Sequence, residues 1–487
     1  MNQAIDYHAI LPELILSGTI ILVLIVDVFL PARRKWFAMP LSLLGVLASL
    51  VAVLTLLGTN RSTFSGMFVV DNFAVLFKIF FLIVAAVVLA ISLRYFREGG
   101  FYQGEYYFLL LTSFLGCLLM PSSRDLLMLF LSLELVSAPG FLMAAFRKSD
   151  PRSNEAGLKF FLIGVLSTAV MLYGMSLIYG VTGETRLDAI AQSLDVVSGG
   201  KLEITYAAIL FVVAGFAFKV SAVPFQFWAP DTYEGSPVPV AAFLAVASKA
   251  AGFAGLLQLM FVAFLHQAGF WTPIIAALSI LTMTVGNLIA LQQRQVIRLL
   301  AYSGIAQAGY ILLPFALAGR DAATDERAFS VAVAYILIYG VMNLGAFSVA
   351  TAVSRRSPGL LFRDFAGLGR AAPLLAVGMA VFFASLAGVP PTGGFWAKIF
   401  IFTAAIDRGG IGTALAVVML VNTVMAIYYY FAIPRQMFFE VGEDTTELRV
   451  PLLVTGVVAI ALIAVLAAFV WPDWFARAPQ FSTLLGG

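Results

Sequence analysis

The feature that most limits how this chain can fold is a succession of long apolar segments that carry very few charges. Fourteen such runs follow one another along the 487 residues. A helix needs about 20 mostly apolar residues to cross a bilayer. The runs lack the alternation of apolar and polar residues that transmembrane barrel strands show over about ten residues. The sequence therefore predicts an all-α polytopic membrane protein of about 14 transmembrane helices.

The predicted spans have limits that hydropathy sets to within a few residues. They cover 9–30, 37–58, 72–93, 106–122, 124–146, 157–182, 205–227, 237–265, 272–291, 296–318, 328–353, 372–406, 412–433 and 452–475. The basic residues between the spans predict how the bundle is oriented. If the N-terminus is outside, the cytoplasmic loops hold sixteen Lys and Arg and the opposite loops hold eight. The positive-inside bias therefore predicts both termini on the outer, periplasmic side.

The composition excludes several other classes of protein. Charged residues make up only 11% of the chain and hydrophobic residues 61%, whereas about a quarter of a soluble domain is charged. The single Cys117 excludes a disulfide scaffold. The net charge of +3 gives no basic patch for nucleic acid, so no nucleic-acid partner is expected.

Some of the lysines lie inside the apolar runs instead of in the loops between them. They are Lys78, Lys159, Lys219, Lys249 and Lys398. At 1.5 Å per residue, Lys219, Lys249 and the acid Glu134 lie roughly 15–21 Å into their spans, near the middle of an apolar core about 30 Å thick. Lys78 and Lys159 lie near span ends, where snorkelling to the surface is an equally good explanation.

A carboxylate beside a buried lysine provides chemistry that suits proton transfer. Burial favours the neutral amine and a nearby carboxylate favours the ammonium, so moving the acid switches the lysine between charge states. For one pair, a static ion pair that only fixes helix packing is an equally good interpretation. Several midplane lysines in one chain favour an ion path.

Two spans contain similar interruptions. The seventh has Val223-Pro224 followed by Phe227-Trp228, and the twelfth has Val389-Pro390 followed by Phe395-Trp396. The twelfth run, about 35 residues long, would be ~52 Å as one helix, too long for the bilayer. Proline and glycine at 390–394 predict a break, whose freed backbone groups must line a wet or protein-buried cavity. Because the two motifs lie five helices apart, we expect an inverted repeat.

These motifs resemble those of the antiporter-like membrane subunits of respiratory complex I, which are similar to the large subunits of multi-subunit Na+/H+ antiporters. The matching stretches are 132–135, 216–219, 224–235 and 388–395, and the resemblance covers about residues 106–433. Within the family the chain is most similar to the N-type subunits of bacterial NADH–quinone oxidoreductase. The sequences of Pro12-Glu13-Leu14 and of residues 229–235 favour that type. The chain also ends about twelve residues after its last span, without the lateral helix of the L type.

The resemblance implies a role for each of the main charged residues. Glu134 matches the acid of the fifth helix, which pairs with Lys219 of the broken seventh helix. Lys249 matches the bridging lysine of the eighth helix, and Lys398 matches the lysine of the broken twelfth helix in an outward half-channel. Lys159 matches a lysine of the sixth helix near the inner side.

The resemblance also implies a division of the chain. It comprises a three-helix segment at 1–105, a first repeat of helices 4–8 at 106–265, a second, inverted repeat of helices 9–13 at 266–433, and the fourteenth helix at 434–487. Helices 7 and 12 are expected to be broken. Lys78 receives no role, and His266, at the outer end of the eighth span, is equally well explained as an interfacial residue.

The implied function is proton translocation through the Glu/Lys relay, coupled to quinone reduction elsewhere in a complex I of the bacterial inner membrane. Polar groups that are candidates to hold connecting water are Ser248, Tyr302, Ser303, Gln307, Asn343 and Asn422. Each of them is individually better explained as an interhelical hydrogen-bonding residue. The implied partners are the lipid bilayer, the antiporter-like subunit M and small membrane subunits such as K and J.

No cofactor is expected in this chain. One cysteine cannot hold an iron–sulfur cluster, and the widely separated His8 and His266 suggest no metal site. NADH, FMN, iron–sulfur clusters and quinone are therefore expected in partner subunits. Two other functions stay open: a stand-alone or multi-subunit cation/proton antiporter, and a structural membrane subunit that moves no ions. The sequence does not distinguish H+ from Na+, or a bacterial from an organellar host.

Overall fold

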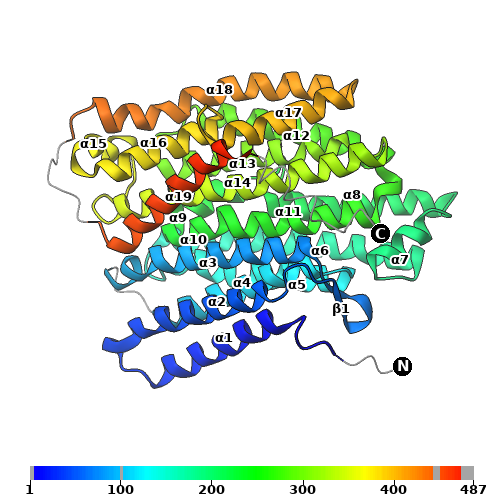
Figure 1. The fold of residues 1–487 in the computed structure, drawn as a ribbon, viewed down its shortest axis with the longest axis horizontal. Coiled ribbons are helices and arrows are strands. Elements are labelled where there is room, and N and C mark those ends of the chain that lie inside the picture. Colours follow the sequence, from blue (N-terminus) through cyan, green and yellow to red (C-terminus); the bar gives the residue numbers. More distant parts are fainter. Residues whose placement is uncertain (1–4, 99–102, 443–449, 473–487) are drawn as a thin grey trace.

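The computed structural model describes residues 5–98, 103–442 and 450–472. Figure 1 shows long helices lying side by side with their axes roughly parallel. Thirteen helices of the described part are long and apolar enough to cross a membrane. A further pair, α16 and α17, accounts for the twelfth predicted span. The prediction of a polytopic all-α membrane protein is therefore confirmed.

The helices of the first half begin and end close to the predicted spans. They are α1 (Leu11–Phe29), α2 (Ala38–Leu54), α3 (Asn72–Glu98), α4 (Gln103–Leu119), α5 (Leu126–Ala144), α6 (Pro151–Thr182), α7 (Leu187–Leu194), α8 (Gly200–Val220), α9 (Trp228–Gly235), α10 (Val238–Phe243) and α11 (Lys249–Gln258). A π-helical segment, η4 (Leu244–Ser248), joins α10 to α11, and a second one, η5 (Leu259–Ala263), extends α11 to complete the eighth span. These wide turns had no signal in the hydropathy.

The second half follows the same pattern. Its helices are α12 (Ala268–Ala290), α13 (Val296–Leu312), α14 (Ala322–Ser354), α15 (Leu368–Ala371), α16 (Pro373–Ala387), α17 (Gly393–Arg408), α18 (Ile411–Phe439) and α19 (Leu452–Val470). Short 3-10 helices are η1 (Ala32–Phe37), η2 (Phe64–Gly66), η3 (Met120–Ser122), η6 (Leu265–Gln267), η7 (Pro314–Leu317) and η8 (Phe362–Phe365). The last predicted span extends to 475, and residues 473–475 lie outside the described part. The division at 105, 265 and 433, and the inverted relation of the repeats, stay predictions.

A small hairpin connects α2 to α3. Strand β1 (Arg61–Thr63) pairs antiparallel with β2 (Phe68–Val70), with Arg61 opposite Val70. Figure 1 shows β1 and α7 at one end of the bundle and α15 at the other. Loops that the charge bias assigned to opposite sides of the membrane thus lie at opposite ends. Two of the counted basic residues, Arg449 and Arg477, lie outside the described residues.

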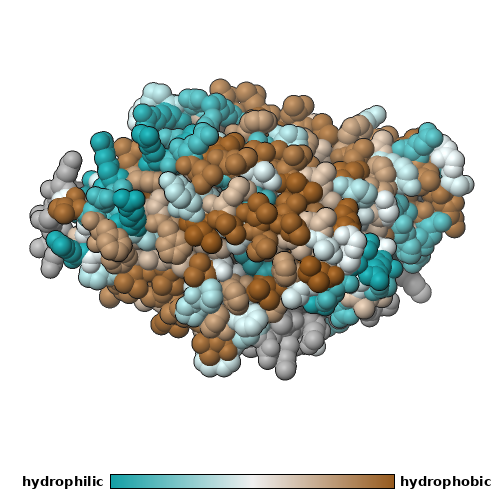
Figure 2. Space-filling view, turned by 90° about the horizontal axis from the view of Figure 1, so that it is seen from above, coloured by the Kyte–Doolittle hydropathy of each residue, from teal (hydrophilic) through white to brown (hydrophobic). Residues whose placement is uncertain are grey.

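The surface and the core are arranged as a bilayer requires. Figure 2 shows apolar residues across the middle of one face and hydrophilic residues toward its two ends. The eighth span, 238–263, is buried throughout its most apolar window, and α14 is buried over 94% of its window. The corresponding fraction is only 33% for α1, α6 and α18. The polar site must therefore be built around the eighth span and α14, at the centre.

Both predicted helix breaks are present. Helix α8 ends where Ser221 adopts φ = +60°. The chain then turns through Pro224, and a new helix, α9, begins at Trp228. Helix α16 ends at Gly388, with φ = +84°, and Pro390 and Pro391 separate it from α17. Glycine accepts that left-handed conformation readily, whereas a serine is strained in it. Ser221 is therefore an unforeseen strained position in the seventh span.

Candidate functional site

The site begins with Lys219, one residue before the end of α8. Its side chain is buried, and its Nζ donates a hydrogen bond of 2.8 Å to Ser137 Oγ on α5. Ser137 lies three residues after Glu134, on the same face of that helix. In the described part of the chain, no carboxylate lies within 4.0 Å of Lys219 Nζ. The direct Glu134–Lys219 contact implied by the resemblance is thus replaced by a contact with the serine.

Glu134 itself lies at the side of the bundle. It lines an apolar groove of about 490 Å³ between α4 and α5, together with Leu131, Leu135 and Leu142. One carboxylate oxygen, Oε1, is buried without a hydrogen-bond partner among the described residues. Glu134 is therefore deep along its helix, as predicted, but open to the lateral face of the bundle. Depth along the helix was estimated correctly, but hydropathy contains no information on which side of the bundle a helix presents to lipid or to a neighbouring subunit.

Lys249 occupies the centre of the bundle, directly after the π-helical segment η4. Its Nζ donates a 3.0 Å hydrogen bond to the carbonyl oxygen of Gly304 on α13 and lies 5.9 Å from the centre of the Tyr233 ring. The side chain of Lys219 packs against Gly252, three residues beyond Lys249 on α11. Positions three apart share a helix face, so Lys219 packs against the face of the eighth span that also carries Lys249.

Polar groups of α14 surround Lys249. Tyr339 donates its hydroxyl to the carbonyl of Ala245 in η4 at 3.2 Å and accepts a 2.6 Å hydrogen bond from Asn343 Nδ2. Asn343 Oδ1, the Tyr233 hydroxyl and Ser221 Oγ are buried without a partner among the described residues. Buried oxygens of this kind normally bind ordered water. The region between the break of the seventh span and Lys249 is therefore suited to hydration.

A second polar group connects α13, α14 and α18. The Tyr335 hydroxyl donates to Gln307 Oε1 at 2.5 Å, and Gln307 Nε2 donates to the Tyr430 hydroxyl at 3.0 Å. Gln307 also donates to the carbonyl of Leu386, one residue from the end of α16, at 3.0 Å. Ser303 Oγ lies 2.5 Å from the Tyr430 hydroxyl. The polar path thus reaches the break of the twelfth span.

Lys398 lies just beyond that break. Its Nζ donates a 2.9 Å hydrogen bond to the carbonyl of Ala387, which the helix end has freed, and lies 4.7 Å from the centre of the Tyr310 ring. The Tyr310 hydroxyl accepts a hydrogen bond from Asn287, whose amide also donates to Asn422 Oδ1 at 3.1 Å. A carbonyl oxygen freed by the break thus accepts a hydrogen bond from a buried ammonium.

Four of the six residues that were candidates to hold connecting water belong to this network. Ser303, Gln307, Asn343 and Asn422 form the hydrogen bonds described above, whereas Ser248 is buried and Tyr302 partly exposed, with no side-chain hydrogen bond to the network in the described part. The sequence analysis did not identify Tyr335, Tyr339 or Tyr430 as members of this network. A signal was present, since Tyr335, Tyr339 and Asn343 are spaced four apart on one face of α14.

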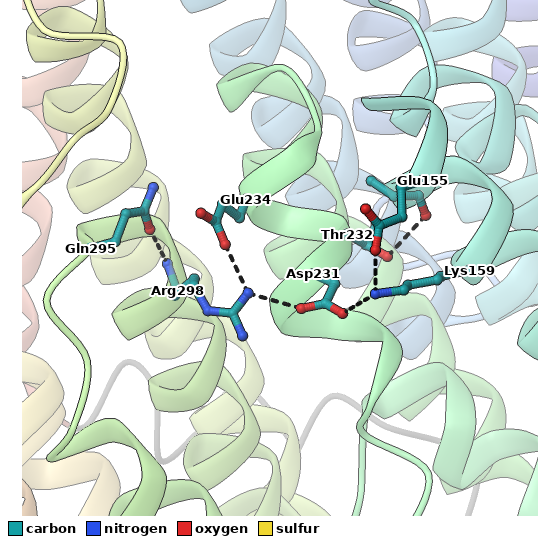
Figure 3. Close-up of polar contacts among 8 residues, drawn as sticks. Glu155, Lys159, Asp231, Thr232, Glu234, Gln295 and Arg298 are labelled. Carbon is teal, nitrogen blue, oxygen red and sulfur yellow. Dashed lines mark hydrogen bonds and ion pairs between the residues drawn. The ribbon is translucent and has the colours of Figure 1, made fainter. Parts of the chain in front are cut away.

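Lys159 belongs to a different cluster. Its Nζ lies 2.7 Å from both Glu155 and Asp231, and Arg298 Nη1 lies 2.8 Å from Asp231 and 2.7 Å from Glu234. Figure 3 shows Asp231 between Lys159 and Arg298. The side chain of Lys159 is 42% exposed, and the cluster lines a pocket of about 280 Å³. Helix α6 begins at Pro151, so Lys159 is not in its first turn as the predicted limit of 157 suggested.

Two remaining residues now have partners. Lys78 is fully buried and forms a 2.8 Å ion pair with Glu13, with its Nζ 4.7 Å from the centre of the Phe68 ring. Snorkelling is therefore the wrong explanation for Lys78, because α1 supplies a carboxylate inside the bundle. His266 is 58% exposed at the end of the eighth span, 3.0 Å from Asp195, as an interfacial residue would be.

The described side chains offer no obvious metal centre. No group of three or more His, Cys, Asp and Glu residues that suits a metal ion occurs among them. Cys117 is buried and free, and its Sγ lies 4.0 Å from the carbonyl of Ala247. Along the path from Lys219 to Lys398, the described side chains supply ammonium groups, hydroxyls and amides, and the half-buried carboxylate of Glu134 lies beside its start.

Comparison with known proteins gives consistent matches. The family model described as "NADH:quinone oxidoreductase/Mrp antiporter, TM" matches residues 123–467. The chain is 41% identical, over 96% of its length, to the NADH-quinone oxidoreductase subunit N of Trichlorobacter lovleyi, of which it covers 94%. It is also 41% identical, over 88% of its length, to the subunit N of Chlorobium chlorochromatii, of which it covers 84%.

Solved structures match over nearly the whole chain. A chain of respiratory complex I from Thermus thermophilus is 30% identical, with a TM-score of 0.80, over 97% of this chain and 99% of that one. A chain of the Mrp complex from Dietzia sp. is 18% identical, with a TM-score of 0.85, over 99% of this chain and 98% of that one. The second likeness concerns the fold alone.

Proposed function

Because this chain belongs to the NADH:quinone oxidoreductase/Mrp antiporter transmembrane family, we propose that it translocates protons as a membrane-arm subunit of an NADH–quinone oxidoreductase. One observation carries the proposal. Lys219, Lys249 and Lys398 are 2%, 1% and 6% exposed, and the Nζ of each donates to an oxygen of another segment. Ionisable groups in the middle of a membrane are costly and mark ion pathways.

The first step of the proposed mechanism concerns the charge state of Lys219. The Glu134 carboxylate lies one turn before Ser137, the residue that accepts the Lys219 hydrogen bond. Movement of the carboxylate toward Lys219 favours the ammonium, and movement away favours the neutral amine. We infer that a proton reaches Lys219 from the cytoplasmic side, where Lys159 and its ion-paired neighbours are proposed to line the inlet.

The second step is lateral transfer. A proton released by Lys219 passes to Lys249, which lies three residues before Gly252, the glycine against which Lys219 packs. From Lys249 it moves along hydroxyl groups and the water that they bind to Lys398, and it leaves on the outer side. Two groups of hydrogen bonds support this route. One contains Tyr339 and Asn343, and the other contains Gln307 and Tyr430. Each hydroxyl both donates and accepts, as proton hopping requires.

The setting of the chain follows from the same proposal. We infer a bacterial inner membrane with both termini on the periplasmic side. Subunit M and small subunits such as K and J are the proposed neighbours. NADH, FMN, iron–sulfur clusters and quinone are assigned to partner subunits, so that this chain contributes to the oxidoreductase as a proton translocase. Relatives with the printed name NADH-quinone oxidoreductase subunit N support this assignment.

The test compares Lys219→Ala and Glu134→Ala with Lys201→Ala in membrane vesicles that contain equal amounts of assembled complex. Lys201 is an exposed lysine in the first turn of the same helix and is a matched control. NADH-driven proton uptake and quinone reduction are recorded together. We expect pumping to fall in the first two variants, with electron transfer falling through coupling, and to persist in the control.

Two results would argue against the proposal. Normal pumping and electron transfer in Lys219→Ala would make that lysine a packing residue and the chain a scaffold. Purification without any redox partner, together with NADH-independent exchange of a cation for H+, would instead identify an antiporter. Repeating the uptake measurement without Na+ separates the two ions.

A further inference from the structure

Each of the three relay lysines packs against a glycine from another segment. A Cβ atom placed on Gly252 would lie 2.9 Å from Lys219 Cγ, and one on Gly388 would lie 2.7 Å from Lys398 Cδ. A Cβ atom on Gly304 would lie 3.2 Å from Lys249 Nζ. Ordinary van der Waals contacts of such atoms are 3.4–4 Å. A side chain at any of the three positions would therefore displace a lysine.

Two of these glycines have another explanation. Gly388 has φ = +84°, a conformation that other residues rarely adopt, and a Cβ on Gly252 would also approach Val220 Cγ1 at 3.2 Å. Gly304 has neither. It lies within the regular helix α13, and the only atoms within 4 Å of a Cβ placed there are Lys249 Nζ and the Tyr339 hydroxyl, at 3.2 and 3.0 Å, within the described part of the chain.

We propose that Gly304 is a positioning residue that fixes the ammonium of Lys249 and the hydroxyl of Tyr339 in the polar path. This inference rests on the proposed proton relay. The carbonyl of Gly304 accepts the hydrogen bond from Lys249 Nζ, and the missing side chain of the same residue leaves the space that the ammonium occupies. Glycine inside a helix is less stable than alanine, so its presence here needs a local reason. Access of Lys249 to the carbonyl is that reason.

The experiment uses the assembled complex with Gly304→Ala, Gly304→Ser and Gly255→Ala. Gly255 is a matched control, because it is buried on α11 and a Cβ there would press on Phe216 Cε1 at 2.8 Å and Met120 Sδ at 3.0 Å, neither of which belongs to the relay. Protons taken up per NADH oxidised are measured in vesicles, with quinone reduction recorded in parallel.

We expect Gly304→Ala to assemble and to lower coupled pumping about three- to tenfold, because the new methyl group shifts the ammonium and removes part of the effect of one hydrogen bond to a charged group. Gly304→Ser should recover part of the pumping, because its Oγ offers the displaced ammonium a new acceptor. A purely structural role predicts the reverse order, since serine is larger than alanine and a poorer helix former. The clash at Gly255 is the tighter of the two, so Gly255→Ala shows how much pumping packing alone removes. We expect it to retain more pumping per assembled complex than Gly304→Ala, and an equal loss in both would overturn the inference.

Including Lys249→Ala separates this inference from the function on which it rests. Normal pumping by Lys249→Ala would overturn the relay itself. Loss of pumping in Lys249→Ala with normal pumping in Gly304→Ala would overturn only the role of Gly304. A serine variant no better than alanine would also overturn it, because packing would then explain the loss.

If Gly304→Ala does not assemble, the double variant Gly304→Ala/Tyr339→Phe is the second measurement. It removes the hydroxyl that lies closest to the new methyl group. Assembly of the double variant with less pumping than Tyr339→Phe alone supports the inference, because the additional obstruction is at Lys249. Failure of the double variant to assemble overturns it, since Gly304 would then be needed for packing.

Discussion

The ion pair between Glu13 and Lys78 allows a quantitative test of how the N-terminal helices are held together. The perturbations are Glu13→Leu, Lys78→Met and the double variant. The two charges lie 2.8 Å apart, with side-chain exposures of 7% and 0%, on α1 and α3. Either single replacement leaves the other charge buried without its partner, whereas the double variant replaces the pair with apolar groups of similar size.

The magnitude follows from the geometry. At 2.8 Å and an effective dielectric constant of ~20, the attraction is about 6 kcal/mol. Desolvation of the two ions offsets much of this attraction, at several kcal/mol each. Removing one partner should therefore lower the free energy of unfolding by about 3–5 kcal/mol. The double variant should lie within about 1 kcal/mol of wild type or be more stable, because no buried charge remains.

The assay is the free energy of unfolding of the full chain in detergent micelles, obtained by titration with SDS. Lys35→Met is the control, because Lys35 pairs with Asp27 at 3.0 Å on the same α1 but with 25% and 12% exposure. It should cost no more than about 1 kcal/mol. The reasoning is refuted if the single variants cost no more than this control, or if the double variant costs the sum of both singles.

Three further changes test other parts of the bundle. Arg124→Ala should lower the free energy of unfolding by about 2–4 kcal/mol in the SDS titration, because the buried carboxylate of Asp71 loses the guanidinium that now lies 2.7 Å away; a cost as small as that of an exposed pair would contradict this. Asp231→Asn should cost only about 0.5–2 kcal/mol, since its two ion pairs are partly exposed, and the cost should shrink in high salt; a cost independent of salt would speak against an ionic cluster. Tyr430→Phe should reduce coupled proton uptake several-fold, by about 1–2 kcal/mol, with assembly intact, because Gln307 Nε2 loses an acceptor; unchanged uptake would remove Tyr430 from the path.

The span limits and the two breaks were predictable because each depends on local sequence. A bilayer has a fixed thickness, so the length of an apolar run alone specifies a crossing. The turns at Pro224 and Pro390 follow from the missing donor of proline. The helical rise likewise predicted Lys219 and Lys249 deep within their spans, and both side chains are buried.

The partners of these charges were not predictable. Glu134 was expected beside Lys219, yet it lines a groove at the side of α5, and Ser137 receives the hydrogen bond. Lys78 finds Glu13 more than sixty residues away in sequence. The hydroxyls of Tyr339 and Tyr430 join helices that are likewise distant along the chain. Such contacts depend on how helices are arranged around one another.

The sequence by itself thus determined the composition of the membrane-spanning units: their number, their breaks and the depth of their charged groups. Hydropathy and helical rise act along the membrane normal, and both are properties of single segments. Only the tertiary structure decided which oxygen each lysine binds, because lateral packing in a uniformly apolar medium is set by side-chain shape and by pairing of the few polar groups. Gly304 illustrates the difference: as one of many glycines in apolar helices it was indistinguishable, and its contact with Lys249 depends on the packing of α13 against α11.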